Sequence, residues 1–310
     1  MINHGAEFVQ KRLRTELEKY ILSQYFGKSP ILLETIKNKL DQEGLLYQKP
    51  YIESSPAYET IENGIKQANM EEWLKNFFLA LAKENLGVYP SPYSHQIEAL
   101  EQTGKGKDLF VATGTGSGKT ECFMWPLLAK IVKEAKNQPN TWQKRGIRTI
   151  IMYPMNALVS DQVSRLRKLL GDQEGKFIDI FRKFCGNKSR RPQFGMYTGR
   201  TPYPGSEPNK TADDKLRKTL QRLDRQDDKD NSYLELLEKE GKIPAKNNLH
   251  LFLEQLKNDV HKPDPEDAEL LTRFEMQQYC PDILITNYSM LEYMLLRPIE
   301  KKFGRIQKNG

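Results

Sequence analysis

The sequence predicts an α/β protein built on a mostly parallel sheet, and two observations support this. From Val88 onward, short apolar segments alternate with longer segments whose apolar residues recur at helical spacing. Strands that alternate with helices favour a parallel sheet covered by helices on both faces. In addition, the glycine-rich segment VATGTGSGKT lies at residues 111–120, between a predicted strand and a predicted helix. Such a loop is typical of α/β proteins that bind phosphate groups.

The N-terminal part, residues 1–87, is predicted to be helical. Apolar residues gather on one helical face in three segments: 6–26, 29–44 and 70–87. In the second segment Ser29 is a candidate N-cap and Pro30 occupies the first helical position, which are favourable places for both residues. We expect residues 1–87 to form an accessory region that packs against a larger domain, residues 88–310.

Strands and helices follow in order along the larger domain. Strands are predicted at residues 105–113, 145–154, 194–199 and 281–287. Helices are predicted at residues 119–135, 156–171 and 288–298. Each of these strands is short and apolar, and each helix has apolar residues on one face.

A charged segment at about residues 206–279 interrupts this alternation and is predicted to be a helical insertion. Leucines recur in it at helical spacing, and two further helices are predicted at residues 247–262 and 264–279. The second of these has acidic residues in its first turn, where the helix dipole favours them. We interpret the charges of the insertion as a solvated surface.

The glycine-rich loop has the residue types needed to bind a nucleoside triphosphate. Its glycines allow backbone N–H groups to converge on one anion, and the following helix contributes the positive end of its dipole. Lys119 brings an ammonium to the β- and γ-phosphates, and the Thr120 hydroxyl can ligate Mg²⁺. The strict pattern G-x-x-x-x-G-K-[ST] has glycine where this chain has Thr113. The residues predicted to bind ATP and Mg²⁺ here are Thr113, Gly114, Thr115, Gly116, Ser117, Gly118, Lys119, Thr120 and Glu121, with Lys119 and Thr120 in catalytic positions.

Composition narrows the class of protein further. Of the 310 residues 38% are hydrophobic and 29% charged, and the net charge is +7. That charge favours either a polyanionic partner or a lysine-rich solvated surface, and the sequence leaves both open. The three cysteines are scattered, which argues against a disulfide scaffold or a zinc site. We find no signal peptide or transmembrane-length apolar run, so we expect a cytoplasmic protein with no membrane partner.

Four segments, in this order, resemble the first motor lobe of superfamily 2 helicases of the DEAD/DEAH-like kind. They are PYSHQIEAL, TGTGSGKTE, YPMNALVSDQ and the pair MYTGRT and PDILITNYSMLEYML. The amino-acid sequences of these segments are similar to those of large bacterial helicases of the Lhr and MrfA types, including those of the Druantia and DISARM antiphage defence systems. The resemblance covers residues 88–298 and implies a RecA-like three-layer lobe.

The resemblance also implies site residues outside the glycine-rich loop. Gln96 matches the glutamine that reads adenine, and an amide suits this because it both donates and accepts hydrogen bonds. Tyr93 is placed to stack on the base. The residues predicted to contact nucleic acid are Pro154, Asn156, Gln162, Arg165, Gly199, Arg200, Thr286 and Asn287, with Thr201 as an alternative to Arg200. Contacts of this kind reach phosphates and carry no sequence information.

The sequence lacks the D-E-x-[DH] box that, in this superfamily, holds Mg²⁺ and orients the attacking water. The second lobe with its arginine finger is absent as well, so we expect the N-terminal part of a larger motor and leave catalysis by this chain alone open. The leading interpretation is an ATP-dependent DNA helicase or translocase acting on single-stranded DNA or on a duplex being unwound, with other subunits of a defence system as candidate partners. The alternatives are an RNA-directed motor and a non-catalytic ATP-binding scaffold.

Overall fold

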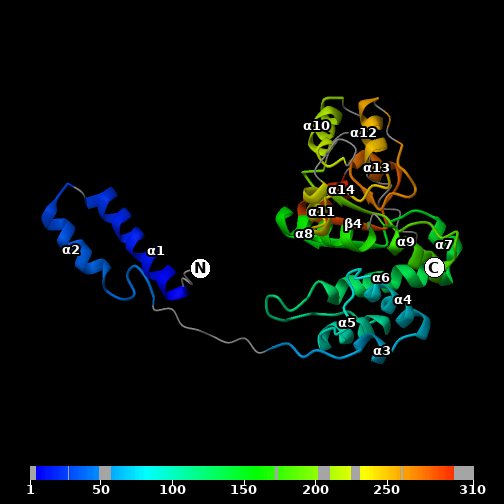
Figure 1. The fold of residues 1–310 in the computed structure, drawn as a ribbon, viewed down its shortest axis with the longest axis horizontal. Coiled ribbons are helices and arrows are strands. Elements are labelled where there is room, and N and C mark those ends of the chain that lie inside the picture. Colours follow the sequence, from blue (N-terminus) through cyan, green and yellow to red (C-terminus); the bar gives the residue numbers. More distant parts are fainter. Residues whose placement is uncertain are drawn as a thin grey trace. The chain divides into compact units, whose positions relative to one another are not determined.

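A computed structural model describes most of the chain, which divides into two compact units, Met1–Ala57 and Tyr58–Gly310 (Figure 1). The described residues are 5–26, 28–48, 57–171, 174–201, 210–224, 231–258, 260 and 262–296. Helix α4 (Glu72–Lys83), part of the predicted accessory region 1–87, lies within the larger unit. The predicted start of the insertion, about residue 206, and the segment after residue 296 lie outside the described residues.

The smaller unit consists of helix α1 (Ala6–Ile21), a π-helical turn (Leu22–Phe26) and helix α2 (Pro30–Leu40). Pro30 is the first helical residue, as predicted, and Ser29 occupies the N-cap position without a capping hydrogen bond from its side chain. Neither α1 nor α2 has a buried residue. Within its described residues this unit therefore has almost no apolar core of its own.

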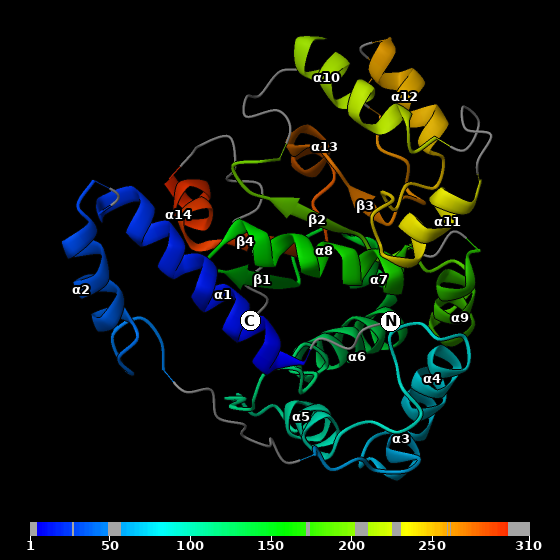
Figure 2. The ribbon, with the colours of Figure 1, turned by 60° about the vertical axis from the view of Figure 1, so that its left-hand side comes forward.

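The larger unit contains a sheet of four parallel strands in the order β1-β4-β2-β3. The strands are β1 (Thr149–Tyr153), β2 (Phe194–Tyr197), β3 (Glu269–Leu270) and β4 (Ile283–Asn287). Three of them confirm predicted strands, and the parallel pairing confirms the predicted fold class. Figure 2 shows β1, β4 and β2 side by side, with helix α8 (Asn156–Leu170) lying along them.

Helices cover both faces of this sheet. The remaining helices of the larger unit are α3 (Gly64–Gln67), α5 (Ser94–Gly104), α6 (Glu121–Asn137), α7 (Pro139–Gln143), α9 (Lys176–Cys185), α10 (Lys210–Gln221), α11 (Asn231–Lys239), α12 (Leu249–Lys257), α13 (Arg273–Gln278) and α14 (Tyr288–Leu296). On one face, Ile151, Phe194 and Ile283 join a large core with residues of α4, α6, α8 and α9. On the other face, Leu284 and Tyr197 pack with methionines of α13 and α14. The sheet is thus the middle of three layers. No helix among the described residues is long and apolar enough to span a membrane.

The strand predicted at residues 105–113 is wrong. These residues form no strand in the structure, and the Phe110 side chain is 94% exposed. An isolated strand gains nothing without a neighbour, because strand preference reflects packing and pairing within a sheet. Among the described strands, β1 is the edge of the sheet, and none lies beyond it to pair with this segment.

The continuous helix predicted at residues 264–279 is also wrong. Its first half contains strand β3, and only Arg273–Gln278 is helical. Glu269 pairs with Phe194 of β2 and is buried, and both of its carboxylate oxygens accept hydrogen bonds from Arg167 of α8, at 2.7 Å each. Long-range pairing thus overrides the local acidic pattern, and the insertion contributes a strand to the sheet.

One part of the sheet stays uncovered among the described residues. Ile150 and Met152 of β1 lie in register with Leu284 and Thr286 of β4, on the face that α13 and α14 cover elsewhere. Ile150 is nonetheless 42% exposed and Met152 50% exposed. The second helical layer therefore covers β4 and β2 and leaves β1 open.

Buried ion pairs hold the end of the sheet where β4 begins. Asp282 is fully buried and accepts hydrogen bonds from Arg148 Nη1 at 2.8 Å and from Arg190 at 2.6 and 2.7 Å. The two guanidinium groups lie over the ring of Trp142, at 4.8 and 4.0 Å from its centroid. Since removing one partner of a buried pair leaves an uncompensated charge, this cluster fixes the strand starts rigidly.

Candidate functional site

The glycine-rich loop leads into the first turn of helix α6, and the lysine of the loop is hydrogen-bonded to the loop's own backbone. Gly116 and Gly118 have φ angles of +76° and +69°, which few other residues adopt. Lys119 Nζ donates to the carbonyl oxygens of Thr113, at 2.6 Å, and Gly114, at 2.5 Å. An anion bound by the loop would offer this ammonium a better partner than two neutral carbonyls, because hydrogen bonds between charged groups are stronger.

Helix α5 brings the predicted adenine-reading residue onto this loop. Gln96 is buried; its Nε2 donates to Gly118 O at 3.0 Å, and its Oε1 accepts from Tyr93 N at 3.0 Å. The neighbouring His95 Nε2 contacts Ser117 O at 2.8 Å. The two sequence segments are thus in direct contact, and a base that pairs with the Gln96 amide either replaces one of these two bonds or uses the second N–H and the second lone pair of the amide.

Three aromatic rings lie beside the loop. Tyr93 and His95 are stacked with centroids 5.5 Å apart, and Tyr58 meets both rings edge-on, at 5.5 and 5.8 Å. The Tyr58 hydroxyl lies so close to Gly114 that a Cβ at that position would clash with it. No sequence motif contains Tyr58; the antiparallel bridge between Thr60 and Tyr93 brings this distant residue to the loop.

The loop and the helix that follows fit an Mg²⁺-bound nucleoside triphosphate. Left-handed glycines, a lysine that donates to two neutral carbonyls and a threonine before α6 are the groups that such a ligand needs. Thr120, the predicted Mg²⁺ ligand, is the N-cap residue of α6 and is partly exposed. Elsewhere in the described ranges, no group of three or more His, Cys, Asp or Glu side chains could hold a metal ion.

The ends of three strands bring several of the predicted nucleic-acid residues together. Because β1, β2 and β4 are parallel, their carboxyl ends meet at one edge of the sheet. There, Asn287 Nδ2 after β4 donates to Asn156 Oδ1 after β1 at 2.7 Å. Pro154, Gly199 and Arg200 at the same edge are exposed. These five positions form an accessible edge.

Three other predicted residues are buried at or near this edge. The Thr286 hydroxyl donates to Tyr197 O at 2.7 Å, and the Thr201 hydroxyl donates to Met196 O at 2.6 Å. Gln162, a residue of helix α8, is buried and donates to the Asp161 carboxylate at 3.1 Å. In this arrangement the two threonines bond to the backbone around the edge, and all three side chains are buried.

Arg165 links the accessible edge to the loop. Its Nη1 lies 3.0 Å from Glu121 Oε1 in the first turn of α6, and its Nε lies 3.2 Å from Asp161 of its own helix. Glu121 is buried, and burial together with the charge of Glu121 raises the pKa of the nearby Tyr89 hydroxyl. The predicted nucleic-acid helix α8 and the predicted phosphate-binding helix α6 are therefore joined by an ion pair.

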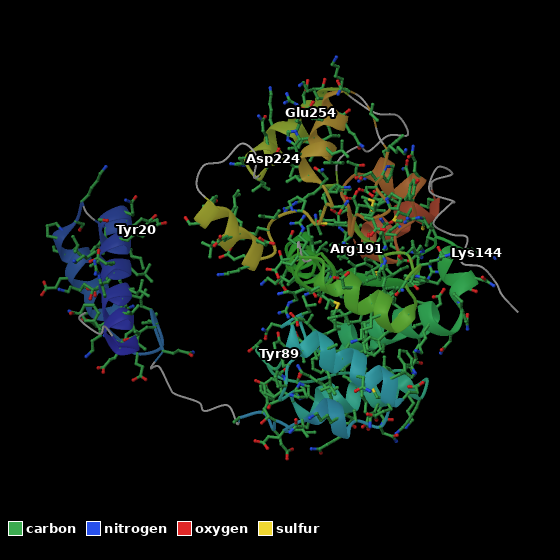
Figure 3. All side chains as sticks on the ribbon, turned by 45° about the vertical axis from the view of Figure 1, so that its right-hand side comes forward. Tyr20, Tyr89, Lys144, Arg191, Asp224 and Glu254 are labelled. Carbon is green, nitrogen blue, oxygen red and sulfur yellow. The ribbon has the colours of Figure 1, made fainter. Side chains whose placement is uncertain are left out.

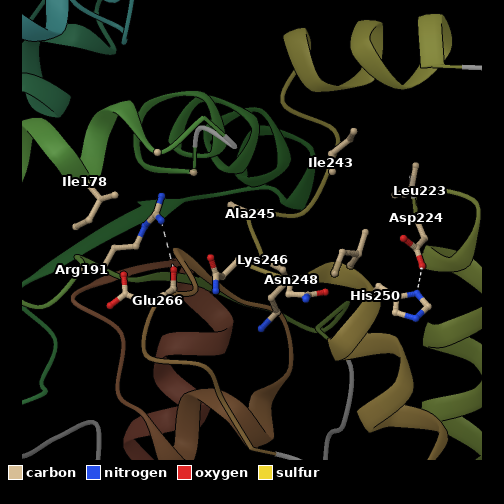
Figure 4. A pocket seen from close by; sticks show the side chains of 14 residues that line it. Ile178, Arg191, Leu223, Asp224, Ile243, Ala245, Lys246, Asn248, His250 and Glu266 are labelled. Atoms are coloured by element: carbon tan, nitrogen blue, oxygen red, sulfur yellow. Dashed lines mark hydrogen bonds and ion pairs between the residues drawn. The ribbon is translucent and has the colours of Figure 1, made fainter. Parts of the chain in front are cut away.

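A separate cavity of about 350 Å³ lies between the lobe and the insertion (Figure 4). At its wall Arg191 donates to Leu170 O at 2.5 Å, and His250 Nδ1 lies 2.7 Å from Asp224. Figure 3 shows Asp224 and Glu254 on the insertion, and Asp224 is one of the residues that line the cavity. None of the predicted site residues lines it, so it is distinct from the loop and from the accessible edge.

Comparisons with known proteins agree with the resemblance inferred from the motifs. Residues 93–224 match the family model of DEAD/DEAH box helicases. Over 319 aligned residues the chain is 38% identical to Druantia protein DruE of Escherichia coli (strain UMEA 4076-1), covering 96% of the chain and 17% of that protein. It is 34% identical to the uncharacterized ATP-dependent helicase YprA of Bacillus subtilis (strain 168) over 28% of the chain and 10% of that protein. It is also 34% identical to ATP-dependent RNA helicase ROK1 of Lodderomyces elongisporus over 33% of the chain and 17% of that protein. The chain thus spans less than a fifth of the length of each of these relatives.

Proposed function

Because residues 93–224 of the chain are a DEAD/DEAH box helicase segment, we propose that the chain is the first motor lobe of an ATP-dependent DNA helicase or translocase. The similarity to a Druantia protein along almost the whole chain supports a role in antiphage defence. In this proposal the loop at residues 113–120 binds ATP with Mg²⁺, and the accessible edge contacts the phosphates of one DNA strand.

The observation that carries this proposal is the physical continuity of the two candidate sites. Gln96 is hydrogen-bonded to the phosphate loop, and Arg165 of α8 is paired with Glu121 at the start of α6. Helix α8 begins at Asn156, on the accessible edge. A change at the nucleotide can therefore reach the nucleic-acid edge through one ion pair and one helix.

Different residues of the chain bind the phosphates and the base of the nucleotide. Lys119 gives up its carbonyl partners to bind phosphate oxygens, and Gln96 and the nearby rings of Tyr58 and Tyr93 orient the base. The Thr120 hydroxyl would help to hold a bound Mg²⁺, which would neutralise negative charge that develops on the phosphates. In the 310 residues no Asp is followed directly by Glu, so the D-E-x-[DH] box does not occur. We therefore propose that this chain alone binds ATP but turns it over negligibly.

ATP binding is tested by titration of a fluorescent ATP analogue into wild type, Lys119→Ala and Lys130→Ala. Lys130 is exposed on α6 and serves as the matched control. Losing the charge-assisted bonds of Lys119 should weaken ATP binding by roughly 10- to 100-fold, and Lys130→Ala should bind as wild type does. Equal affinities for all three proteins would refute the assignment of the loop.

Nucleic-acid type is tested separately, because some similar proteins are RNA helicases by name. Unlabelled oligo-dT and oligo-U compete for the chain against a fluorescent DNA strand. We expect oligo-dT to compete more strongly. Preference for oligo-U would favour an RNA-directed motor, and failure of both polymers to bind would favour an ATP-binding scaffold.

A further inference from the structure

The insertion delivers an arginine to the accessible edge of the sheet. Strand β3 pairs in parallel with β2, so the residues after both strands lie at the same edge. Arg273 follows β3 as the first residue of α13 and is only 3% exposed. Its Nη2 donates to Thr198 O at 2.6 Å, and its guanidinium lies 4.9 Å from the centroid of the Tyr197 ring.

The carbonyl that Arg273 contacts closes a tight turn. Thr201 N donates to the same Thr198 oxygen at 3.1 Å, and Thr198 N donates to the Thr201 hydroxyl at 2.9 Å. Between them, Gly199 and Arg200 form the exposed tip of the turn. Arg273 is therefore positioned to hold the turn in shape from below while its tip faces solvent.

Arg273 is itself held by a buried ionic cluster. Thr272 and Glu275 form a capping box at the start of α13, and Glu275 also accepts from Leu271 N at 2.9 Å. The fully buried ammonium of Lys246 contacts Glu275 and lies 2.9 Å from Asp267. This network spans the insertion and fixes the helix that carries Arg273.

Among the described residues, the surroundings of the Arg273 charge differ from those of three partly buried arginines that pair with carboxylates. Arg148 and Arg190 share the carboxylate of Asp282, and Arg167 binds Glu269. Within the described ranges no carboxylate forms an ion pair with Arg273, and its Nε has no hydrogen-bond partner. Buried charges in proteins are ordinarily paired, because transfer out of water is costly. An anion at the turn would supply the missing countercharge.

We propose that Arg273 is a positioning residue that, through Thr198, shapes the turn 198–201 as a phosphate-binding turn and adds a positive charge beneath it. A backbone phosphate of the nucleic acid then binds at the exposed tip, close to Gly199 and Arg200. This inference rests on the proposed nucleic-acid function, and it gives the helical insertion a role in binding.

The test compares Arg273→Met, Arg273→Lys and a control, Arg222→Met, in the 310-residue chain. Arg222 is an exposed arginine of the same insertion, so it receives the same substitution outside the cluster. Binding of a fluorescent oligo-dT is measured over a salt series, and binding of the ATP analogue is measured in parallel. Hydrogen exchange of the segment 194–201 reports the order of the turn without any ligand.

Arg273→Met should weaken oligo-dT binding by about tenfold, the loss expected for one hydrogen bond to a charged group. The slope of log affinity against log salt should fall by about 0.7, the contribution of one phosphate contact on a single strand. Exchange at Thr198 and Thr201 should speed up, while ATP binding stays unchanged. Arg273→Lys should restore most of the affinity, and Arg222→Met should match wild type.

Two results would overturn the proposal. One is unchanged oligo-dT affinity and slope in Arg273→Met; the other is parallel loss of ATP and oligo-dT binding, which indicates a general structural role. If wild type itself does not bind oligo-dT, the proposed DNA function fails, and hydrogen exchange still decides whether Arg273 orders the turn.

Discussion

At the phosphate loop, polar groups bond to the chain's own backbone near an exposed surface, whereas at the contact between insertion and sheet they are buried and paired with charges. Lys119 is held by two carbonyl oxygens of its loop, and Gln96 by one carbonyl and one amide. Glu269 and Lys246, in contrast, are buried in ion pairs. Bonds of the first kind can be exchanged for bonds to a ligand at small cost, and bonds of the second kind cannot. The loop is thus suited to change partners, and the insertion contact to hold its shape.

The largest effect should come from breaking the insertion contact. Glu269→Ala leaves Arg167 without its buried carboxylate and Ala245 N without its acceptor. Loss of one partner of a buried pair costs about 3–5 kcal/mol. Urea unfolding followed by circular dichroism measures this change in the free energy of unfolding.

The matched control is Glu254→Ala, which removes an exposed carboxylate of the same insertion, 3.5 Å from Lys257. Exposed pairs contribute roughly 0–1 kcal/mol, so this variant should unfold nearly as wild type does. Similar losses in both variants would contradict the distinction between a fixed contact and an exchangeable loop.

An intermediate effect is expected at Gln96, where exchange of bonds is proposed. Gln96→Ala should reduce the preference for ATP over GTP by about 1–3 kcal/mol, because the amide that pairs with adenine is lost. Titration of both nucleotides into wild type and variant measures this preference. Glu98→Ala, on the exposed face of the same helix, is the control. Equal weakening for ATP and GTP would argue against base reading by Gln96.

The smallest change in stability should come from the link between the two sites. Because Arg165 is half-exposed, its ion pair with Glu121 should contribute only about 0.5 kcal/mol in a double-mutant cycle. Arg165→Ala should nevertheless lower the salt slope of oligo-dT binding by about 0.7, as expected for one phosphate contact. Lys168→Ala, exposed on the same helix, is the control in the same salt titration. An unchanged slope in Arg165→Ala would mean that Arg165 pairs with Glu121 but does not contact a phosphate of the nucleic acid.

The sequence predicted those features that depend on local pattern. The loop, helix α8, and strands β1, β2 and β4 all follow from spacing and residue type, whereas Asn156 and Asn287 were singled out by the resemblance to helicases and are hydrogen-bonded in the structure. The segment 105–113 was predicted wrongly, since a strand depends on a neighbour that no local pattern specifies.

Features that depend on distant pairing could not be predicted. Strand β3 has only two residues, and its acidic residue is acceptable in a strand because Arg167 pairs with it from another element. Arg273 and Tyr58 acquire their positions from this strand and from an isolated bridge, respectively. Neither residue lies in a recognisable motif, and their roles depend on contacts between segments far apart in the sequence.

The open strand β1 has a consequence for the behaviour of this chain in concentrated solution. Its sequence, TIIMY, is apolar and without charge, and Ile150 and Met152 are exposed beside an edge with no paired strand among those described. Such an edge is a template for strands of other molecules, and short segments of this composition favour cross-β association. The net charge of +7 opposes encounters between copies, but salt screens that repulsion. The high salt that removes bound nucleic acid during purification is therefore also the condition under which this chain is most prone to aggregate.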